Sequence, residues 1–166
     1  MRPMTRVGYR VWQLWRALTG RLSADEHVYA QKTLTPAEYA LFVRMPSYDQ
    51  RHCMDVALVL GRFGVTDASV LALALLHDIG KVGDDGRALS LWWYGFNVLL
   101  RPLPALRDWL LPRCEPLRRS MTHEQRSVAM ASAGGARADV CALLAVLAHG
   151  GADARITLFE EADDQC

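Results

Sequence analysis

A histidine and an aspartate stand side by side where a long apolar run ends. The run Val70–Leu76 contains only valine, leucine and alanine, and His77-Asp78-Ile79-Gly80-Lys81 follows it directly. Burying an imidazole next to a carboxylate is costly unless a partner compensates both groups, and a metal ion is a natural partner. We therefore interpret the run as a buried helix that carries two metal-ligating side chains at its C-terminal end.

Six side chains of types that bind metals are spread along the chain: His52, His77, Asp78, His123, His149 and Asp163. His52 precedes His77 by 25 residues, and 26 residues separate His123 from His149. Imidazole nitrogens and carboxylate oxygens suit Mn, Fe, Co, Ni or Zn rather than calcium. The set is larger than one open catalytic ion usually takes from a protein. One or two ions are therefore expected, with Asp78 bridging if there are two.

Nearly every segment has the periodicity of a helix, and the alternation typical of strands is absent, so we predict an all-α protein. The expected helices are one with an apolar stripe over 7–18, then about 36–44, 47–60, 67–77, 89–100, one around 106–110, 123–133, 138–148 and 153–164. Thr35–Glu38 and Ser47–Gln50 have the pattern of capping boxes at helix starts. Thr66 or Asp67 is expected to cap the following helix, and Thr122 the helix over 123–133.

The predicted helices place most of the ligand-type side chains at helix ends. One of the four histidines falls early in its helix, two fall at C-terminal ends and one falls at a start. Side chains at the ends of separate helices can converge on one cavity of a bundle. Asp163 lies in the last helix, and Asp164 beside it is an alternative ligand.

The bulk composition is that of an ordinary globular domain. The chain has 166 residues, 51% of them hydrophobic, and a formal net charge of +1, so nothing global indicates nucleic-acid binding. Its four cysteines form no CxxC pair and are interpreted as reduced thiols of a cytoplasmic protein. We find no pattern of a signal peptide, and no stretch of about 18 clean apolar residues for a membrane span.

The spaced ligands also match a known pattern. His52, His77-Asp78 and Asp163 resemble the H…HD…D signature of the HD-domain superfamily of metal-dependent phosphohydrolases. The run from His77 to Lys81 is similar to the HDIGK form of that signature, and Ala162-Asp163 is similar to the AD pair on its last helix. The similarity covers roughly residues 50–164.

The resemblance implies a helical bundle with a five-helix core around a metal site. His123 and His149 resemble the two extra histidines of dinuclear members of the superfamily. The single domain 1–166 would then have three parts: an N-terminal helical extension (1–46), a metal-site core (47–81 and 122–164) and a Trp-rich helical insertion (82–121).

The implied function is that of a metal-dependent phosphohydrolase. It would cleave a phosphomonoester or phosphodiester of a nucleotide, using a metal-activated hydroxide. Asp78 is expected to be catalytic as a metal ligand. Lys81 is expected to act in catalysis and to bind a phosphate oxygen of the substrate as a point charge. Arg51, beside His52, is a second candidate for substrate binding.

Two alternatives belong to other classes of protein. A few superfamily members are diiron oxygenases with nearly the same six ligands, and a non-catalytic module would use the metal pocket to bind a nucleotide in signalling. The cyclic-dinucleotide phosphodiesterases carry a Gly-Tyr-Pro signature and usually a doubled histidine. Neither feature appears at His149, which lies between Ala148 and Gly150, so that activity is not expected. The Trp-rich segment 89–111 suggests a buried surface in a homodimer.

Overall fold

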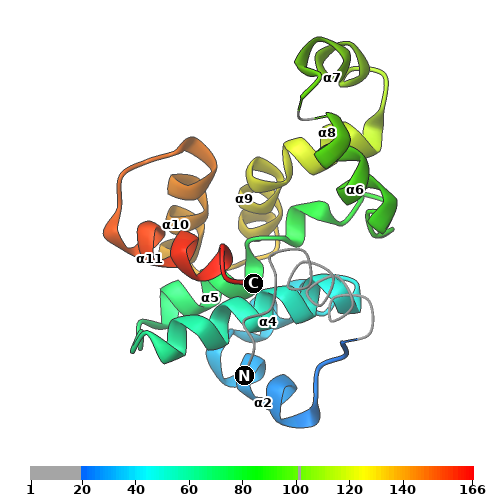
Figure 1. Ribbon diagram of the computed structural model, residues 1–166. Helices are drawn as coiled ribbons and strands as arrows, with labels where there is room; N and C mark the ends of the chain where they lie inside the picture. The colour runs from blue at the N-terminus through cyan, green and yellow to red at the C-terminus, as the bar shows by residue number, and fades with distance from the viewer. Residues whose placement is uncertain (1–19, 101) are drawn as a thin grey trace, which may run out of the picture.

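A computed structural model describes residues 20–100 and 102–166, and every regular element in those ranges is helical (Figure 1). The predicted all-α class is therefore confirmed. The helix predicted over 7–18 lies outside the described residues. The elements are α2 (Ala24–Thr33), α3 (Pro36–Phe42), α4 (Ser47–Arg62), α5 (Ala68–Leu76), the 3₁₀ turn η1 (Ile79–Lys81), α6 (Leu91–Leu100), α7 (Pro104–Leu110), α8 (Glu115–Met121), α9 (His123–Ala133), α10 (Ala138–His149) and α11 (Ala154–Asp163).

Some of the helix caps predicted from the sequence form in the structure. The capping box that begins at Thr35 forms, since its side chain accepts from Glu38 N and Glu38 binds back to Thr35 N. Asp67, rather than Thr66, caps α5 by accepting from Ser69 N. Two helices, α2 and α8, have no counterpart in the sequence prediction, although Ser23 caps α2 with a complete capping box.

Two predicted caps, at Ser47 and Thr122, are wrong. Pro46, not Ser47, occupies the N-cap position of α4, and Gln50 donates instead to Met45 O at 2.6 Å. Proline fixes the φ angle needed at a helix entry, so the helix begins without a side-chain cap. Thr122 also makes no cap bond, because its hydroxyl donates to Arg118 O at 2.9 Å.

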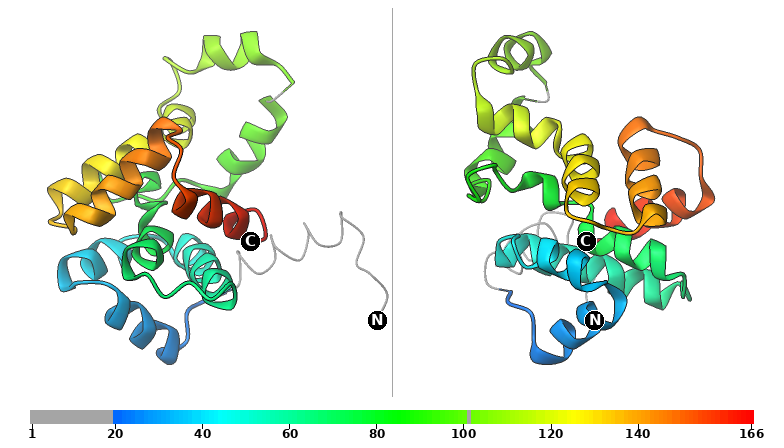
Figure 2. Two further views of the ribbon diagram at one scale, coloured as in Figure 1. Left: turned by 90° about the vertical axis from the view of Figure 1, so that its left-hand side faces the viewer. Right: turned by 180° about the vertical axis from the view of Figure 1, so that it is seen from behind.

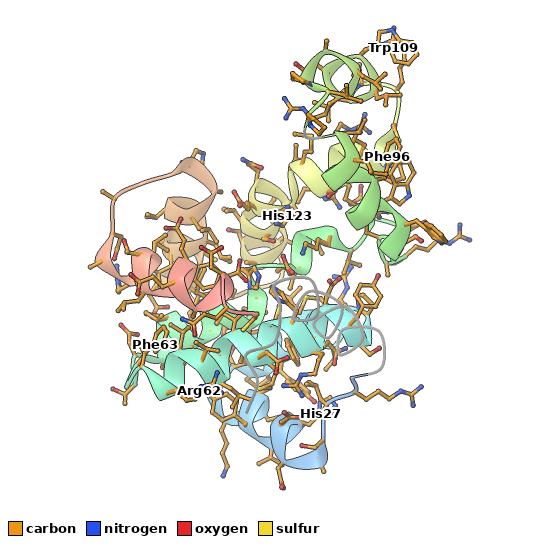
Figure 3. The ribbon with its side chains drawn as sticks, viewed as in Figure 1. His27, Arg62, Phe63, Phe96, Trp109 and His123 are labelled. Atoms are coloured by element: carbon orange, nitrogen blue, oxygen red, sulfur yellow. The ribbon has the colours of Figure 1, made fainter. Side chains whose placement is uncertain are left out.

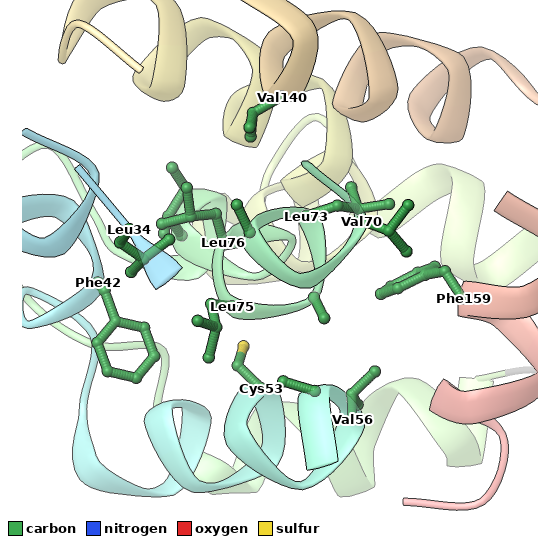
Figure 4. Close-up of a cluster of buried hydrophobic side chains, with 14 of the residues drawn as sticks. Leu34, Phe42, Cys53, Val56, Val70, Leu73, Leu75, Leu76, Val140 and Phe159 are labelled. Atoms are coloured by element: carbon green, nitrogen blue, oxygen red, sulfur yellow. The ribbon is translucent and has the colours of Figure 1, made fainter. Parts of the chain in front are cut away.

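Helix α5 lies at the centre of the fold and is buried on nearly all sides. Seven of its nine residues are buried, and it packs against α4, α10, α11, α2 and α3. Figure 4 shows Leu75 directed toward α4 and Cys53, while Val70 and Leu73 lie on the side of α10 and α11. A helix that is apolar all round can be stable only inside such a shell. Consequently the residues that follow α5 emerge inside the protein rather than on its surface.

Helices α6, α7 and α8 project away from this bundle (Figures 1 and 2). Helix α8 packs on α9 and η1, and α6 packs on α8 and α7. No residue of α7 is buried. Among the described residues no single helix is long and apolar enough to cross a membrane. Helices α10 and α11, which meet at a 72° bend, pass that test only when counted together, and by length and composition alone.

A buried ion pair holds α3 to the start of α10. Glu38 is completely buried, and Arg137 binds it through Nε and the backbone N, each at 3.0 Å from Oε1. Burial opposes the charge of Glu38, but the hydrogen bonds from Arg137 and Thr35 outweigh it and hold the pKa below its ordinary value. The carboxylate is therefore ionised in the folded protein and depends on Arg137 for its partner.

We predict that Arg137→Met lowers the free energy of unfolding by about 3 kcal/mol at pH 7, because it removes the side-chain cation that pairs with the buried Glu38 carboxylate. Since folding lowers the pKa of Glu38, its stabilising contribution is complete above the unfolded-state pKa of about 4.3 and is lost as the pH falls through the folded-state pKa. The difference in the free energy of unfolding between Arg137→Met and wild type should therefore shrink below about pH 4.

Urea unfolding followed by circular dichroism measures this difference at each pH. Arg62→Met, at the exposed end of α4, is the control, and an equal loss in both variants at pH 7 would contradict the prediction.

Candidate metal centre

Five of the six predicted ligands come together where α4, α5, α9 and α11 meet. They are His52, His77, Asp78, His123 and Asp163. His52 lies in the second turn of α4, and His77 continues the last turn of α5 through a bond from its backbone N to Leu73 O. Asp163 is the last residue of α11, and His123 begins α9 (Figure 3). Residues far apart in the sequence thus converge at helix ends, as the sequence predicts.

The Asp78 carboxylate lies at the centre of this cluster. Its Oδ1 lies 3.5 Å from His77 Nε2 and 3.6 Å from His123 Nε2. Its Oδ2 lies 3.9 Å from His52 Nε2 and accepts a hydrogen bond from Lys81 Nζ at 2.5 Å. Because Asp78 is only 1% exposed, these groups rather than water must compensate its charge.

Asp163 brings a second carboxylate to the same imidazoles. Its Oδ1 lies 3.0 Å from His52 Nε2 and 3.8 Å from His77 Nε2. Although burial opposes both charges, the short contact is an ion pair that raises the pKa of His52 and lowers that of Asp163, and this buried Asp163 oxygen makes no further hydrogen bond within the described ranges. A metal ion bound between the two groups would replace the proton of His52 as the partner of this oxygen. Ligand atoms bound about 2.1 Å from one ion are separated by about 3.0 to 3.4 Å, close to the spacing found here.

The imidazole rings are oriented as metal ligands require. The Nδ1 of His77 lies 2.9 Å from Ala74 O, and the Nδ1 of His123 lies 2.8 Å from Ser120 O. A backbone carbonyl can only accept, so Nδ1 carries the proton in the neutral ring and Nε2 keeps a free lone pair. In both residues it is Nε2 that faces Asp78. Such carbonyl contacts are typical supports of ligating histidines.

Helix α9 fixes the loop that carries His77 and Asp78. The hydroxyl of Ser127, fully buried on α9, donates to His77 O at 2.6 Å and accepts from Gly80 N at 2.9 Å. Gly80 permits this close approach, because a Cβ atom there would lie 2.0 Å from His123 O. The glycine of the motif is thus required by packing against α9.

Arg126 supports the same loop and, like Ser127, is missing from the sequence prediction. Its Nε donates to Gly80 O and its Nη2 to Val82 O, each at 3.0 Å, and Nη2 also pairs with Asp84 at 2.9 Å. Arg126 and Ser127 follow His123 by three and four residues, the spacing that shares one helix face. That spacing is the signal in the sequence that points to them.

The electrostatics keep the carboxylates charged and the cluster balanced. Burial opposes ionisation of Asp78, but the neighbouring imidazoles and Lys81 hold its pKa well below the ordinary value. Burial likewise opposes the charges of Lys81 and His52, yet the nearby carboxylates raise the pKa of both groups. The pKa of His77 is lowered, chiefly by burial, so this ring is neutral and able to bind a cation.

Cys53 is a buried neighbour of the cluster and, with His77 and Asp78, forms a group of side chains that could hold a metal ion. Its Sγ lies 3.7 Å from His77 Nδ1, on the side of the ring that faces Ala74 O. Burial raises the pKa of the thiol well above its ordinary value. Without a bound ion the thiol is protonated and packs as a small apolar side chain behind His77.

Two predicted site residues do not join the cluster. Arg51 is buried and its guanidinium binds Glu26 and Asp55, each at 2.7 Å, so it does not line the cavity as a substrate ligand. His149 is exposed at the end of α10, where its Nδ1 lies 2.7 Å from Ala145 O. The last turn of α10 directs it elsewhere, so the structure does not bring the sixth ligand to the site.

A cavity of about 450 Å³ opens onto the metal-type ligands. Lys81 lines it, and the Phe159 ring packs edge-on against His77 with ring centroids 5.0 Å apart. Three carboxylates that the sequence prediction did not assign to a site, or assigned only as an alternative, also line it: Glu124, Glu160 and Asp164. The cavity has the size of a small-molecule site.

Comparison of the chain with protein-family models, curated proteins and solved structures gives no match. The HD-domain resemblance therefore rests on the residues of the chain alone.

We predict that Ser127→Ala lowers the free energy of unfolding by about 1 to 3 kcal/mol, because it leaves His77 O and Gly80 N buried without their partner. Urea unfolding of the metal-free protein measures this loss. Ser132→Ala, exposed on the same helix, should change stability by less than about 0.5 kcal/mol. If both serine variants unfold at the same denaturant concentration as wild type, α9 does not hold the loop in this way.

Proposed function

We propose that this chain is an HD-type, metal-dependent phosphohydrolase that acts on a small phosphomonoester or phosphodiester, such as a nucleotide. The observation that carries the proposal is the buried Asp78 carboxylate, which has imidazole Nε2 atoms near both of its oxygens and a lysine beside it. It opens onto a cavity large enough for such a substrate. Hydrolysis of phosphate esters is among the slowest uncatalysed reactions and needs this concentration of charge.

The ligands divide naturally between two positions around Asp78. His52, His77, Asp78 and Asp163 would hold one divalent transition metal. Asp78 Oδ1 and His123 would contribute to a second ion, which then has fewer protein ligands than the first because His149 lies outside. When bound, such ions lower the pKa of a coordinated water and neutralise phosphoester oxygens.

Lys81 supplies a fixed positive charge inside the cavity. Its ammonium group remains protonated because Asp78 raises its pKa. It can therefore bind a phosphate oxygen as a point charge at any physiological pH. Glu124, Glu160 and Asp164 line the same cavity. An anionic substrate would be attracted only when the positive charges of the bound metal and Lys81 exceed the negative charge of these three carboxylates.

Two alternative functions, a diiron oxygenase and a non-catalytic binding module, are distinguished from the hydrolase by the test below. The oxygenase resemblance depends on six ligands, and the exposed position of His149 gives it less support than the hydrolase. The non-catalytic module would use Lys81 to bind a nucleotide phosphate in the same way, so turnover is what separates it from the hydrolase. The position of His149 therefore favours hydrolysis over the oxygenase only.

The test is turnover of p-nitrophenyl phosphate, bis-p-nitrophenyl phosphate and nucleoside phosphates after reconstitution with Mn, Fe, Co, Ni or Zn. We predict that His52→Ala and Asp163→Ala each lower turnover at least about 100-fold, because each removes a ligand of the first ion. His27→Ala on α2, whose Nδ1 contacts Tyr39 OH, is the matched histidine control and should keep wild-type turnover.

His149→Ala reports on the second ion and should change turnover less than about threefold. Aerobic oxygen consumption with iron, without phosphate release from any substrate, would replace the hydrolase with the oxygenase. Nucleotide binding without turnover under any metal would replace it with the binding module.

A further inference from the structure

The segment from α6 to α8 concentrates the exposed apolar side chains of the described part of the protein. Six of them define what we call the arm surface: Trp92, Phe96, Leu99, Leu103, Leu106 and Trp109. Trp92 is 87% exposed, Leu99 70% and Trp109 56%. Exposed aromatic and leucine side chains at this density in a short segment are unusual for a surface that faces only water.

The apolar side chains of α7 are exposed and need a binding partner. Helix α7 has only seven residues, none of them buried, and it packs mainly against α6. Leu103, Leu106 and Leu110 recur at helical spacing across this short element. A helix of two turns is not stable in water by itself, so its apolar side needs a partner. Figure 3 places Trp109 at the far tip of the arm and Phe96 on its outer side, away from the bundle.

The charge of the arm indicates what that partner is. Residues 91–121 contain five arginines but only two acidic residues, although the whole chain has a net charge of only +1. Within this segment Arg107 pairs with Asp108, and Arg119 is buried beside Glu115, whereas Arg113 and Arg118 are exposed. Arg113 stacks over the Trp109 ring at 4.6 Å from its centroid, so positive charge lies directly beside an exposed apolar group. Two copies of the arm would repel each other, whereas an anionic surface would attract it.

We propose that the arm surface binds the face of an anionic lipid bilayer. Short helices with tryptophan and leucine on one side and arginine nearby lie in the interface between headgroups and acyl chains. Tryptophan favours that depth because its ring is amphipathic, and an arginine can keep its charge at the headgroups. Trp92 and Trp109 would enter the interface, with Arg107 and Arg113 against the lipid phosphates. The inference is independent of the proposed hydrolase activity.

The test is co-sedimentation of the full chain with vesicles of phosphatidylglycerol and phosphatidylcholine, compared with phosphatidylcholine alone. Binding should require the anionic lipid and weaken as salt rises from about 50 to 500 mM, because exposed charges are then screened. Trp92→Ala with Trp109→Ala should lower the partition coefficient at least about tenfold, since each ring buries a large apolar area. Leu58→Ala with Phe63→Ala, exposed on α4 and just beyond its end, should bind like wild type.

A charge variant separates the two contributions. Arg107→Glu with Arg113→Glu should abolish the preference for anionic vesicles while leaving the circular dichroism spectrum unchanged. Failure of the wild-type chain to bind anionic vesicles at low salt overturns the proposal. So does a stable dimer in sedimentation equilibrium that the paired tryptophan variant dissociates, because a second copy would then be what covers the arm.

Discussion

The charge of Asp78 is the constraint on which the rest of the site depends. Because the carboxylate is 1% exposed, it stays ionised only if positive or hydrogen-donating groups surround it. The chain supplies the Lys81 ammonium to Oδ2 and places the Nε2 atoms of His52, His77 and His123 around both carboxylate oxygens, where a bound cation would compensate the charge. Without an ion, Lys81 is the closest compensating cation. An ion that binds Asp78 Oδ2 must compete with Lys81 for that oxygen. Metal binding at Oδ2 would therefore release the Lys81 ammonium group to pair with a substrate phosphate.

Local packing makes this arrangement possible. Helix α5 is apolar on nearly every side and therefore buried, which forces the residues after it to emerge in the interior. Helix α9 then closes on the emerging loop, where Gly80 leaves room for the His123 backbone and Ser127 satisfies the buried polar groups of the turn. A side chain at position 80 or a lost hydroxyl at position 127 would displace both Asp78 and His123. Backbone contacts therefore set the ligand distances as much as the ligands themselves.

The sequence predicts the helical class well, and five of its six candidate ligands lie close together in the fold, because both features depend on strong local signals. An apolar run followed by His77-Asp78 can only place these groups inside, and helix ends on separate elements tend to meet. The positions of Arg51 and His149 could not be predicted, since a helix rotation of about 100°, the step of one residue, decides whether such a side chain faces the cavity. Arg51 turned instead toward Glu26, which belongs to a helix with no counterpart in the sequence prediction. The predicted cap at Ser47 is wrong because Pro46 takes the N-cap position, one residue earlier.

The identity of the substrate could not be predicted from the sequence, because the walls of the cavity come from segments far apart in the chain.

The most direct test of the central claim is the metal content per chain, measured by elemental analysis of untagged protein purified without chelator, for wild type and His52→Ala. If the Asp78 cluster is a metal centre, wild-type protein carries close to one transition-metal ion or more per chain, and His52→Ala loses most of it while remaining folded by circular dichroism. Wild-type protein that holds no transition metal even after reconstitution, or a His52→Ala variant that retains the full content, would contradict it.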